Sequence, residues 1–226
     1  MSHIAYNLNQ IQELINQHDS AKRVKLIAVS KTFPIEDIQI AYELGMRRFG
    51  ENYPQELATK GQQLTQNDIE WHFIGNIQSN KTKLIAEYAN WVHTLTKASH
   101  ATRLNDQRPP HVPTLQVLIE VNISNEDNKH GIRNLTELTE LANHINQLPN
   151  LKLRGLMGMA SDSSDEALIN SQFKYLHEYY EYLNQNGFEL TELSMGMSND
   201  FPLAIANGAT MVRIGSKIFG ARDYGN

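Results

Sequence analysis

Short apolar segments alternate with amphipathic segments along the whole chain. The apolar segments are typical of buried strands, and they predict strands at residues 25–29, 47–49, 71–74, 91–94, 115–122, 152–157, 190–195 and 211–214. The segments between them have apolar residues at helical spacing, and they predict helices at residues 35–44, 55–63, 81–88, 99–105, 135–147, 166–184 and 201–207. Ile4, Leu8, Ile11 and Ile15 also share one helical face, so a further helix is expected before the first strand.

Eight strands with helical connections predict either a parallel barrel or a doubly wound open sheet. An open sheet that binds a dinucleotide would have G-x-G-x-x-G after its first strand, where this chain reads Ala28-Val29-Ser30-Lys31-Thr32. The number of strands and the even spacing of the strand–helix units favour the barrel. We therefore predict an α/β fold, a (β/α)8 TIM barrel with an extra N-terminal helix. No linker-like segment divides residues 1–226, so we expect a single domain.

Composition narrows the function classes. The 226 residues include 20 basic and 25 acidic side chains, a net charge of −5 that argues against a general nucleic-acid binder. The chain has no cysteine, which excludes disulfides, thiolate zinc sites and cysteine nucleophiles. Its apolar runs are too short to span a membrane, and its N-terminus lacks the features of a signal peptide. We expect a cytoplasmic protein.

Lys31 is the strongest single candidate for a reactive side chain. Functional residues of a barrel gather just past the carboxyl ends of the strands, and Lys31 follows the apolar first strand at this position. Partly dry surroundings lower the pKa of a lysine and make its neutral amine available for imine formation. A lysine at a strand end can equally extend its charge into solvent. Position alone leaves both interpretations open.

The seventh and eighth predicted strands are followed by small residues, namely Ser194, Gly196, Ser198, Gly215 and Ser216. Their backbone N–H groups and hydroxyls would be accessible, and the corresponding loops of barrels commonly bind phosphate. Tight turns would require the same glycines. The occurrence of both turns in this pair of loops favours a phosphate site.

Arg213 lies within the last predicted strand. Because a guanidinium does not lose its proton in proteins, an inward-pointing arginine needs an acceptor, either a carboxylate such as Glu51 or a ligand atom. A reactive lysine, a phosphate site and a buried arginine together match the aldehyde, phosphate and pyridine nitrogen of pyridoxal 5'-phosphate. His72 is more typical of a core histidine than of a base. The nine histidines have no metal-ligand spacing, so no metal site is expected.

Several segments carry a resemblance to a known family. They include Phe49-Gly50-Glu51-Asn52-Tyr53, Trp71-His72-Phe73-Ile74-Gly75, Gln78-Ser79-Asn80-Lys81, Arg154-Gly155-Leu156-Met157, Ser194-Met195-Gly196-Met197-Ser198 and Arg213-Ile214-Gly215-Ser216, together with the Lys31 segment. In these segments the chain resembles the pyridoxal-phosphate homeostasis proteins, single-domain barrels similar to the cofactor domain of alanine racemase. The matching residues extend from 28 to 220 in the family's order.

The resemblance implies cofactor-binding roles for Lys31, Asn52, His72, Ser194, Ser198, Arg213, Gly215 and Ser216. Lys31 would form a Schiff base with the cofactor. Arg213 would face the pyridine nitrogen, and Ser198 would hold the phosphate together with the turn at Gly215 and Ser216. Catalytic residues are not implied.

The implied function is non-catalytic. The resemblance predicts a protein that carries or buffers pyridoxal 5'-phosphate, maintains vitamin B6 and amino-acid homeostasis, and has apo-enzymes as possible recipients. No long apolar surface helix demands a partner, so we expect a monomer. The alternative is a pyridoxal-phosphate-dependent amino-acid racemase, which needs an acid or base on each face of the substrate carbon. In the racemase relatives the second base is a tyrosine from an additional β domain. The sequence ends six residues past Gly220, so we expect that domain to be absent.

Overall fold

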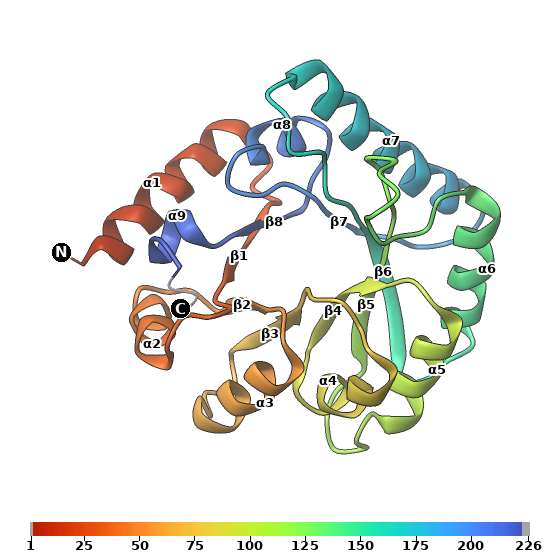
Figure 1. The fold of residues 1–226 in the computed structure, drawn as a ribbon, viewed down its shortest axis with the longest axis horizontal. Coiled ribbons are helices and arrows are strands. Elements are labelled where there is room, and N and C mark those ends of the chain that lie inside the picture. Colours follow the sequence, from red (N-terminus) through yellow and green to blue (C-terminus); the bar gives the residue numbers. More distant parts are fainter. Residues whose placement is uncertain (1, 223–226) are drawn as a thin grey trace.

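Eight parallel strands close into a barrel in sequence order, and β1 pairs with both β2 and β8 (Figure 1). The computed structural model describes residues 2–222. Its strands are β1 (Lys25–Val29), β2 (Arg48–Glu51), β3 (Glu70–Phe73), β4 (Trp91–Leu95), β5 (Leu115–Glu120), β6 (Leu151–Met157), β7 (Glu192–Ser194) and β8 (Met211–Ile214). This arrangement confirms the predicted (β/α)8 barrel.

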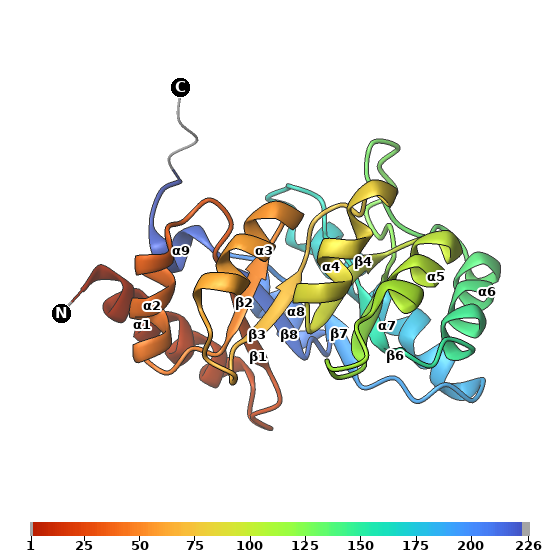
Figure 2. The ribbon, with the colours of Figure 1, turned by 90° about the horizontal axis from the view of Figure 1, so that it is seen from below.

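Helices surround the barrel and cover its outer face (Figure 1). They are α1 (His3–His18), α2 (Ile35–Glu43), α3 (Pro54–Gln63), α4 (Thr82–Tyr88), α5 (Ala98–Gln107), α6 (Leu135–Asn146), α7 (Glu166–Gln185), α8 (Phe201–Ala206) and α9 (Ser216–Phe219), with a 3-10 turn, η1 (Ser79–Lys81), before α4. The predicted N-terminal helix is α1, which packs against α2, α8 and α9. In the side view, α3, α4 and α5 lie in front of the strands (Figure 2). None of the helices within residues 2–222 has the length and apolar character needed to cross a membrane.

Helix starts follow local side-chain chemistry. Asn134 accepts a hydrogen bond from the backbone N–H of Glu137 at the start of α6, and Asp165 accepts two from the first turn of α7. Pro54 occupies the first position of α3, where a missing N–H costs least. These caps explain why the helical patterns of the sequence begin close to the observed boundaries.

The strands separate two packing regions. Alternate side chains such as Phe49 and Trp71 pack outward against the helices in the main core. A second cluster fills the barrel interior and consists of Ile27, Trp91, Leu118, Met157 and Met211, with Met159 against it. Buried polar side chains share this interior, among them His72, which stacks on Trp91. These buried polar side chains lie beneath the carboxyl ends of the strands, where a barrel has its functional residues.

Some boundaries differ from the prediction. The predicted strand 190–195 is observed only over Glu192–Ser194, because the backbone of Leu190 bonds to the side chains of Asn184 and Tyr180 instead of a neighbouring strand. Helix α9 and the turn η1 were not predicted. A single helical turn is too short to produce a periodic pattern.

Candidate functional site

A cavity of about 500 Å³ lies at the carboxyl ends of the strands. Its lining includes six of the eight predicted site residues, namely Lys31, Asn52, Ser198, Arg213, Gly215 and Ser216. Lys129, Met197, Asp200 and Arg222 are among its other lining residues. The structure therefore brings together residues that are up to 185 positions apart, from Lys31 to Ser216, on one face of the barrel.

The backbone on both sides of Lys31 is anchored. The Ser30 hydroxyl donates to Glu51 Oε1 at 2.7 Å, and the Thr32 N–H donates to Glu56 Oε1 at 2.6 Å. Thr32 also has a φ of +68°, in the left-handed region that a threonine rarely adopts. Because such a conformation persists only where the surroundings enforce it, these carboxylates hold the turn that presents Lys31 to the cavity.

Lys60, on α3, connects these anchors. Its ammonium lies 2.6 Å from Glu51 Oε1, 2.7 Å from Glu56 Oε1 and 2.8 Å from the Ser30 carbonyl oxygen. Burial raises the pKa of Glu51 to about 7, although the ammonium of Lys60 opposes this rise. The alternative in which Glu51 is the partner of Arg213 is therefore wrong, because Glu51 faces Lys60 and Ser30.

Arg213 is buried in the barrel and bonds to other groups. Its Nη1 donates to Ser194 Oγ at 2.5 Å, and its Nη2 donates to the Gly158 carbonyl oxygen at 3.2 Å. Burial lowers the pKa of Arg213 to about 10, whereas the nearby carboxylates of Asp200 and Glu120 raise it. The guanidinium has further N–H donors beyond these two bonds, and the side chain lines the cavity.

Ser194 and His72 lie deeper in the barrel than the cavity lining. Ser194 Oγ is 2.8 Å from His93 Nδ1, and His93 Nε2 is 2.8 Å from His72 Nδ1. All three residues are buried. His72 is thus separated from Arg213 by Ser194 and His93, as a hydrogen-bonded core histidine. Direct contact of His72 or Ser194 with a cofactor stays a prediction.

The turn after β8, at Gly215 and Ser216, packs tightly against Arg222 and Val29, and we call this turn the phosphate cradle. A Cβ atom on Gly215 would come within 2.3 Å of Arg222 Nη2 and 3.1 Å of the Val29 carbonyl oxygen, so the glycine lets the guanidinium lie against the backbone. Arg222 Nε is buried and has no hydrogen-bond partner among residues 2–222. A buried N–H beside an accessible backbone turn suits an anion such as a phosphate.

The backbone of Asn52 lies against the loop that follows β3. A Cβ atom on Gly75 would lie 1.9 Å from the Asn52 carbonyl oxygen, so only glycine fits there. The loop after β3 can therefore pack closely against Asn52, which lines the cavity.

Sequence reasoning missed three cations of the site. Lys60 lies in the middle of a helix, Lys129 in the loop after β5, and Arg222 beyond the last strand. Lys129 lines the cavity, where its ammonium lies 3.0 Å from Glu126 Oε1 and 3.2 Å from the Ala160 carbonyl oxygen. Only the position of Arg222, just after the predicted phosphate turn, offered a signal in the sequence.

Comparison with known proteins gives consistent matches along the whole chain. The family model for the alanine racemase N-terminal domain matches residues 1–223. A pyridoxal phosphate homeostasis protein of Pasteurella multocida is 50% identical over 231 residues, which cover 98% of each chain. A protein of the same name from Escherichia coli K12 is 45% identical over 232 residues, which cover 99% of each chain.

Solved structures of related proteins also match this chain over nearly its whole length. PipY of Synechococcus elongatus PCC7942 without pyridoxal phosphate is 34% identical, with a TM-score of 0.87 over 96% of this chain and 100% of that chain. PipY with pyridoxal phosphate bound is 33% identical, with a TM-score of 0.85 over the same shares. An alanine racemase of Bacillus anthracis is 19% identical with a TM-score of 0.71, and the match covers 97% of this chain but 56% of the racemase; this likeness shows the fold alone. The chain therefore belongs to the pyridoxal phosphate homeostasis protein family, within the wider family of the alanine racemase N-terminal domain.

Proposed function

We propose that this chain binds pyridoxal 5'-phosphate in the cavity beside Lys31, and that it carries or buffers the cofactor for vitamin B6 and amino-acid homeostasis. The relatives that match end to end are named pyridoxal phosphate homeostasis proteins, and a solved relative has pyridoxal phosphate bound. The observation that carries the proposal is the convergence of Lys31, Arg213 and the Gly215 turn on one cavity.

The residues present fit this cofactor. When bound, pyridoxal phosphate supplies an aldehyde that condenses with a lysine amine, a phosphate that needs donors, and a ring nitrogen that accepts a hydrogen bond. The turn at Gly215 and the Nε of Arg222, which has no hydrogen-bond partner among residues 2–222, supply donors to the cavity. The volume of about 500 Å³ lies within the usual range of small-molecule sites.

Each group of residues has its own task in this proposal. Lys31 provides the amine, held in place by the anchored turn around it. Ser198, Gly215 and Ser216 bind the phosphate through hydroxyl and backbone N–H groups, with Arg222 adding a positive charge. Arg213 donates toward the ring nitrogen, and Asn52 forms part of the surrounding wall.

We further propose that the chain has no substantial catalytic activity. The support is that the relatives matching 98–99% of the chain are named for homeostasis of the cofactor. In the same proposal residues 1–226 form a single domain, and the protein is a monomer in the cytoplasm. The recipients of the cofactor are apo-enzymes that need it.

An amino-acid racemase is the alternative function, and one feature of the cavity favours it. Lys129 and Asp200 line the same cavity as Lys31, so further ionisable groups lie near the proposed cofactor. The experiment incubates cofactor-loaded protein with a panel of L-amino acids and follows both chirality and transfer to an apo-enzyme. We expect transfer without turnover. Racemisation at ordinary enzyme rates of ~1–1000 per second, lost in Lys31→Ala, would establish the racemase instead.

A further inference from the structure

A chain of buried hydrogen bonds extends along the barrel interior from Arg213. Arg213 Nη1 donates to Ser194 Oγ at 2.5 Å. Ser194 Oγ lies 2.8 Å from His93 Nδ1, and His93 Nε2 lies 2.8 Å from His72 Nδ1. Four strands, β8, β7, β4 and β3, contribute one residue each. Ser194, His93 and His72 have no exposed surface, so solvent does not compete for these bonds.

The donors and acceptors of this chain have one consistent direction. Because a guanidinium only donates, Ser194 Oγ accepts from Arg213, and its hydroxyl hydrogen is available to His93 Nδ1. His93 then has its proton on Nε2 and donates to His72 Nδ1, so His72 also has its proton on Nε2.

The opposite direction fits less well. It would leave the Ser194 hydroxyl hydrogen without an acceptor among the bonds of the described residues. It would also turn the lone pair of His72 Nε2 toward the carboxylate of Glu70, whose Oε1 is 3.9 Å away. His72 Nε2 has no hydrogen-bond partner among the described residues, but its N–H form is attracted to this carboxylate, so we infer that the chain points from Arg213 toward Glu70.

Both histidines are held neutral. Burial lowers the pKa of His72 to about 3, with smaller contributions from Arg48 and Lys25, and burial lowers the pKa of His93 well below its usual range. A neutral imidazole both donates and accepts, as each position in the chain requires. Because both rings stay neutral near neutral pH, each keeps the one donor and the one acceptor that the chain needs.

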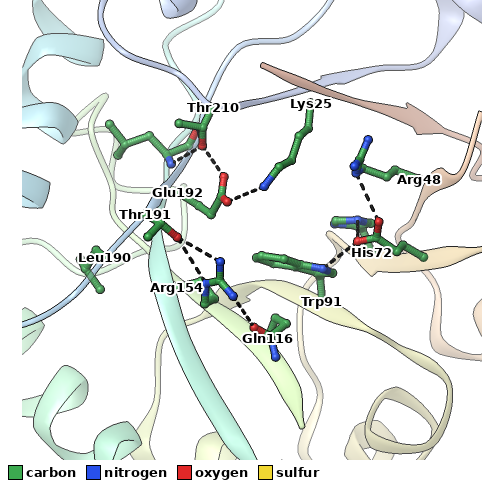
Figure 3. A network of polar contacts seen from close by, with 12 residues as sticks. Lys25, Arg48, His72, Trp91, Gln116, Arg154, Leu190, Thr191, Glu192 and Thr210 are labelled. Atoms are coloured by element: carbon green, nitrogen blue, oxygen red, sulfur yellow. Dashed lines mark hydrogen bonds and ion pairs between the residues drawn. The ribbon is translucent and has the colours of Figure 1, made fainter. Parts of the chain in front are cut away.

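The far end of the chain is packed firmly. The ring of His72 stacks on that of Trp91, with centroids 5.6 Å apart and an interplanar angle of 10°. Trp91 Nε1 donates to Glu70 Oε1 at 3.1 Å, and Arg48 pairs with Glu70 Oε2 at 3.4 Å. Figure 3 shows His72 and Trp91 side by side within this polar network. His72 thus has little freedom to move away from His93.

We propose that Ser194, His93 and His72 are positioning residues that hold Arg213 as a hydrogen-bond donor toward the ring nitrogen of the cofactor. This inference rests on the proposed function, in which Arg213 faces that nitrogen. Successive hydrogen bonds in one direction polarise one another, so Ser194 Oγ becomes a stronger acceptor and fixes the guanidinium. In this proposal the histidines act through Ser194 and Arg213, and neither histidine is among the residues that line the cavity.

The test compares the affinity for pyridoxal phosphate with that for its deaza analogue, in which a C–H group replaces the ring nitrogen. The ratio of the two affinities reports the bond between Arg213 and this nitrogen. In the native protein we expect a ratio of about 10–100, typical of a hydrogen bond to a charged group. His93→Leu breaks the chain and should lower the ratio at least about tenfold. His93→Gln, whose amide can accept and donate, should restore most of it.

A matched control is His100→Leu. His100 is a buried histidine outside the chain that bonds to Ser79, so its loss should leave the ratio unchanged. A purely structural role of His93 would lower stability but would leave the ratio of His93→Leu at the native value, and this result would overturn the proposal.

A second measurement needs neither variant nor cofactor. Nitrogen-15 NMR of the native protein reports which ring nitrogen of each histidine has the proton. We expect His93 and His72 to be protonated on Nε2 from pH 6 to 8, and protonation of either on Nδ1 would overturn the proposal. If the native protein failed to bind pyridoxal phosphate, the proposed function would fail, whereas the NMR result would still decide the direction of the chain.

Discussion

The ammonium of Lys60 lies 2.6 Å from Glu51 Oε1, and both side chains are buried, with 6% and 0% of their surfaces exposed. The same ammonium contacts the carbonyl oxygen of Ser30, the residue before Lys31. Removing Lys60 from a buried ion pair of this kind is strongly destabilising, because Glu51 then lies buried without an opposite charge. The pair therefore couples the stability of α3 to the placement of Lys31.

We expect Lys60→Met to lower the free energy of unfolding by about 3–5 kcal/mol. It should also slow covalent labelling of Lys31 by pyridoxal phosphate, because the Ser30 carbonyl loses its anchor. Urea denaturation and the rate of labelling measure the two effects. Lys83→Met, at an exposed position on α4, is the matched control and should change the unfolding free energy by less than about 0.5 kcal/mol.

The double variant Lys60→Met with Glu51→Gln should recover part of the lost stability, since no unpaired carboxylate then remains buried. A double variant that is less stable than Lys60→Met alone would contradict this account of the pair.

The second prediction concerns the phosphate cradle. Arg222→Gln should weaken binding of pyridoxal phosphate about 10–100-fold, because a charge-assisted hydrogen bond to the phosphate is lost. Binding of unphosphorylated pyridoxal should change little. Equilibrium titrations with both compounds test this, and an equal loss for both would place Arg222 elsewhere in the site.

The third prediction is a pH dependence from Glu120. Burial raises the pKa of this carboxyl to about 7 from 4.5, although Arg213 opposes the rise. Between these values the folded protein binds more protons at Glu120 than the unfolded chain does, so this group's contribution to stability falls as pH rises. Glu120→Gln removes the titration.

The variant should therefore gain stability relative to the native protein as pH rises from 5 to 8. Urea denaturation of both proteins across this range gives the difference directly. A difference that stays constant with pH would show that the carboxyl titrates at its ordinary value.

The fourth prediction compares two glycines. A Cβ atom on Gly155 would lie 1.7 Å from the Glu192 carbonyl oxygen on the neighbouring strand, so Gly155→Ala should cost about 3 kcal/mol or more. Gly187 has a φ of +93° but open space around its Cβ position, so Gly187→Ala should cost only about 1–2 kcal/mol. Thermal unfolding ranks the two variants. The reverse order would contradict the close approach of β6 and β7.

The sequence predicts the barrel well because the strand and helix periods are local properties. The end of each strand then predicts which residues reach the mouth, and Lys31, Arg213 and Gly215 do line the cavity. Lys60 could not be found this way, because its partner Ser30 lies 30 positions away and the contact exists only once α3 packs on the barrel. The contact between His72 and His93 could not be predicted either, because these residues are 21 positions apart and meet only in the closed barrel.

We propose that Lys31 is the residue that binds pyridoxal phosphate covalently. Its most direct test is borohydride reduction of the cofactor-loaded protein, followed by peptide mapping by mass spectrometry. Lys129 lines the same cavity, so it is the natural competitor, and Lys31→Ala and Lys129→Ala provide matched variants. We predict a pyridoxyl group on Lys31 in the native protein and in Lys129→Ala. A label on Lys129, or a label whose yield is unaffected by Lys31→Ala, would contradict the account.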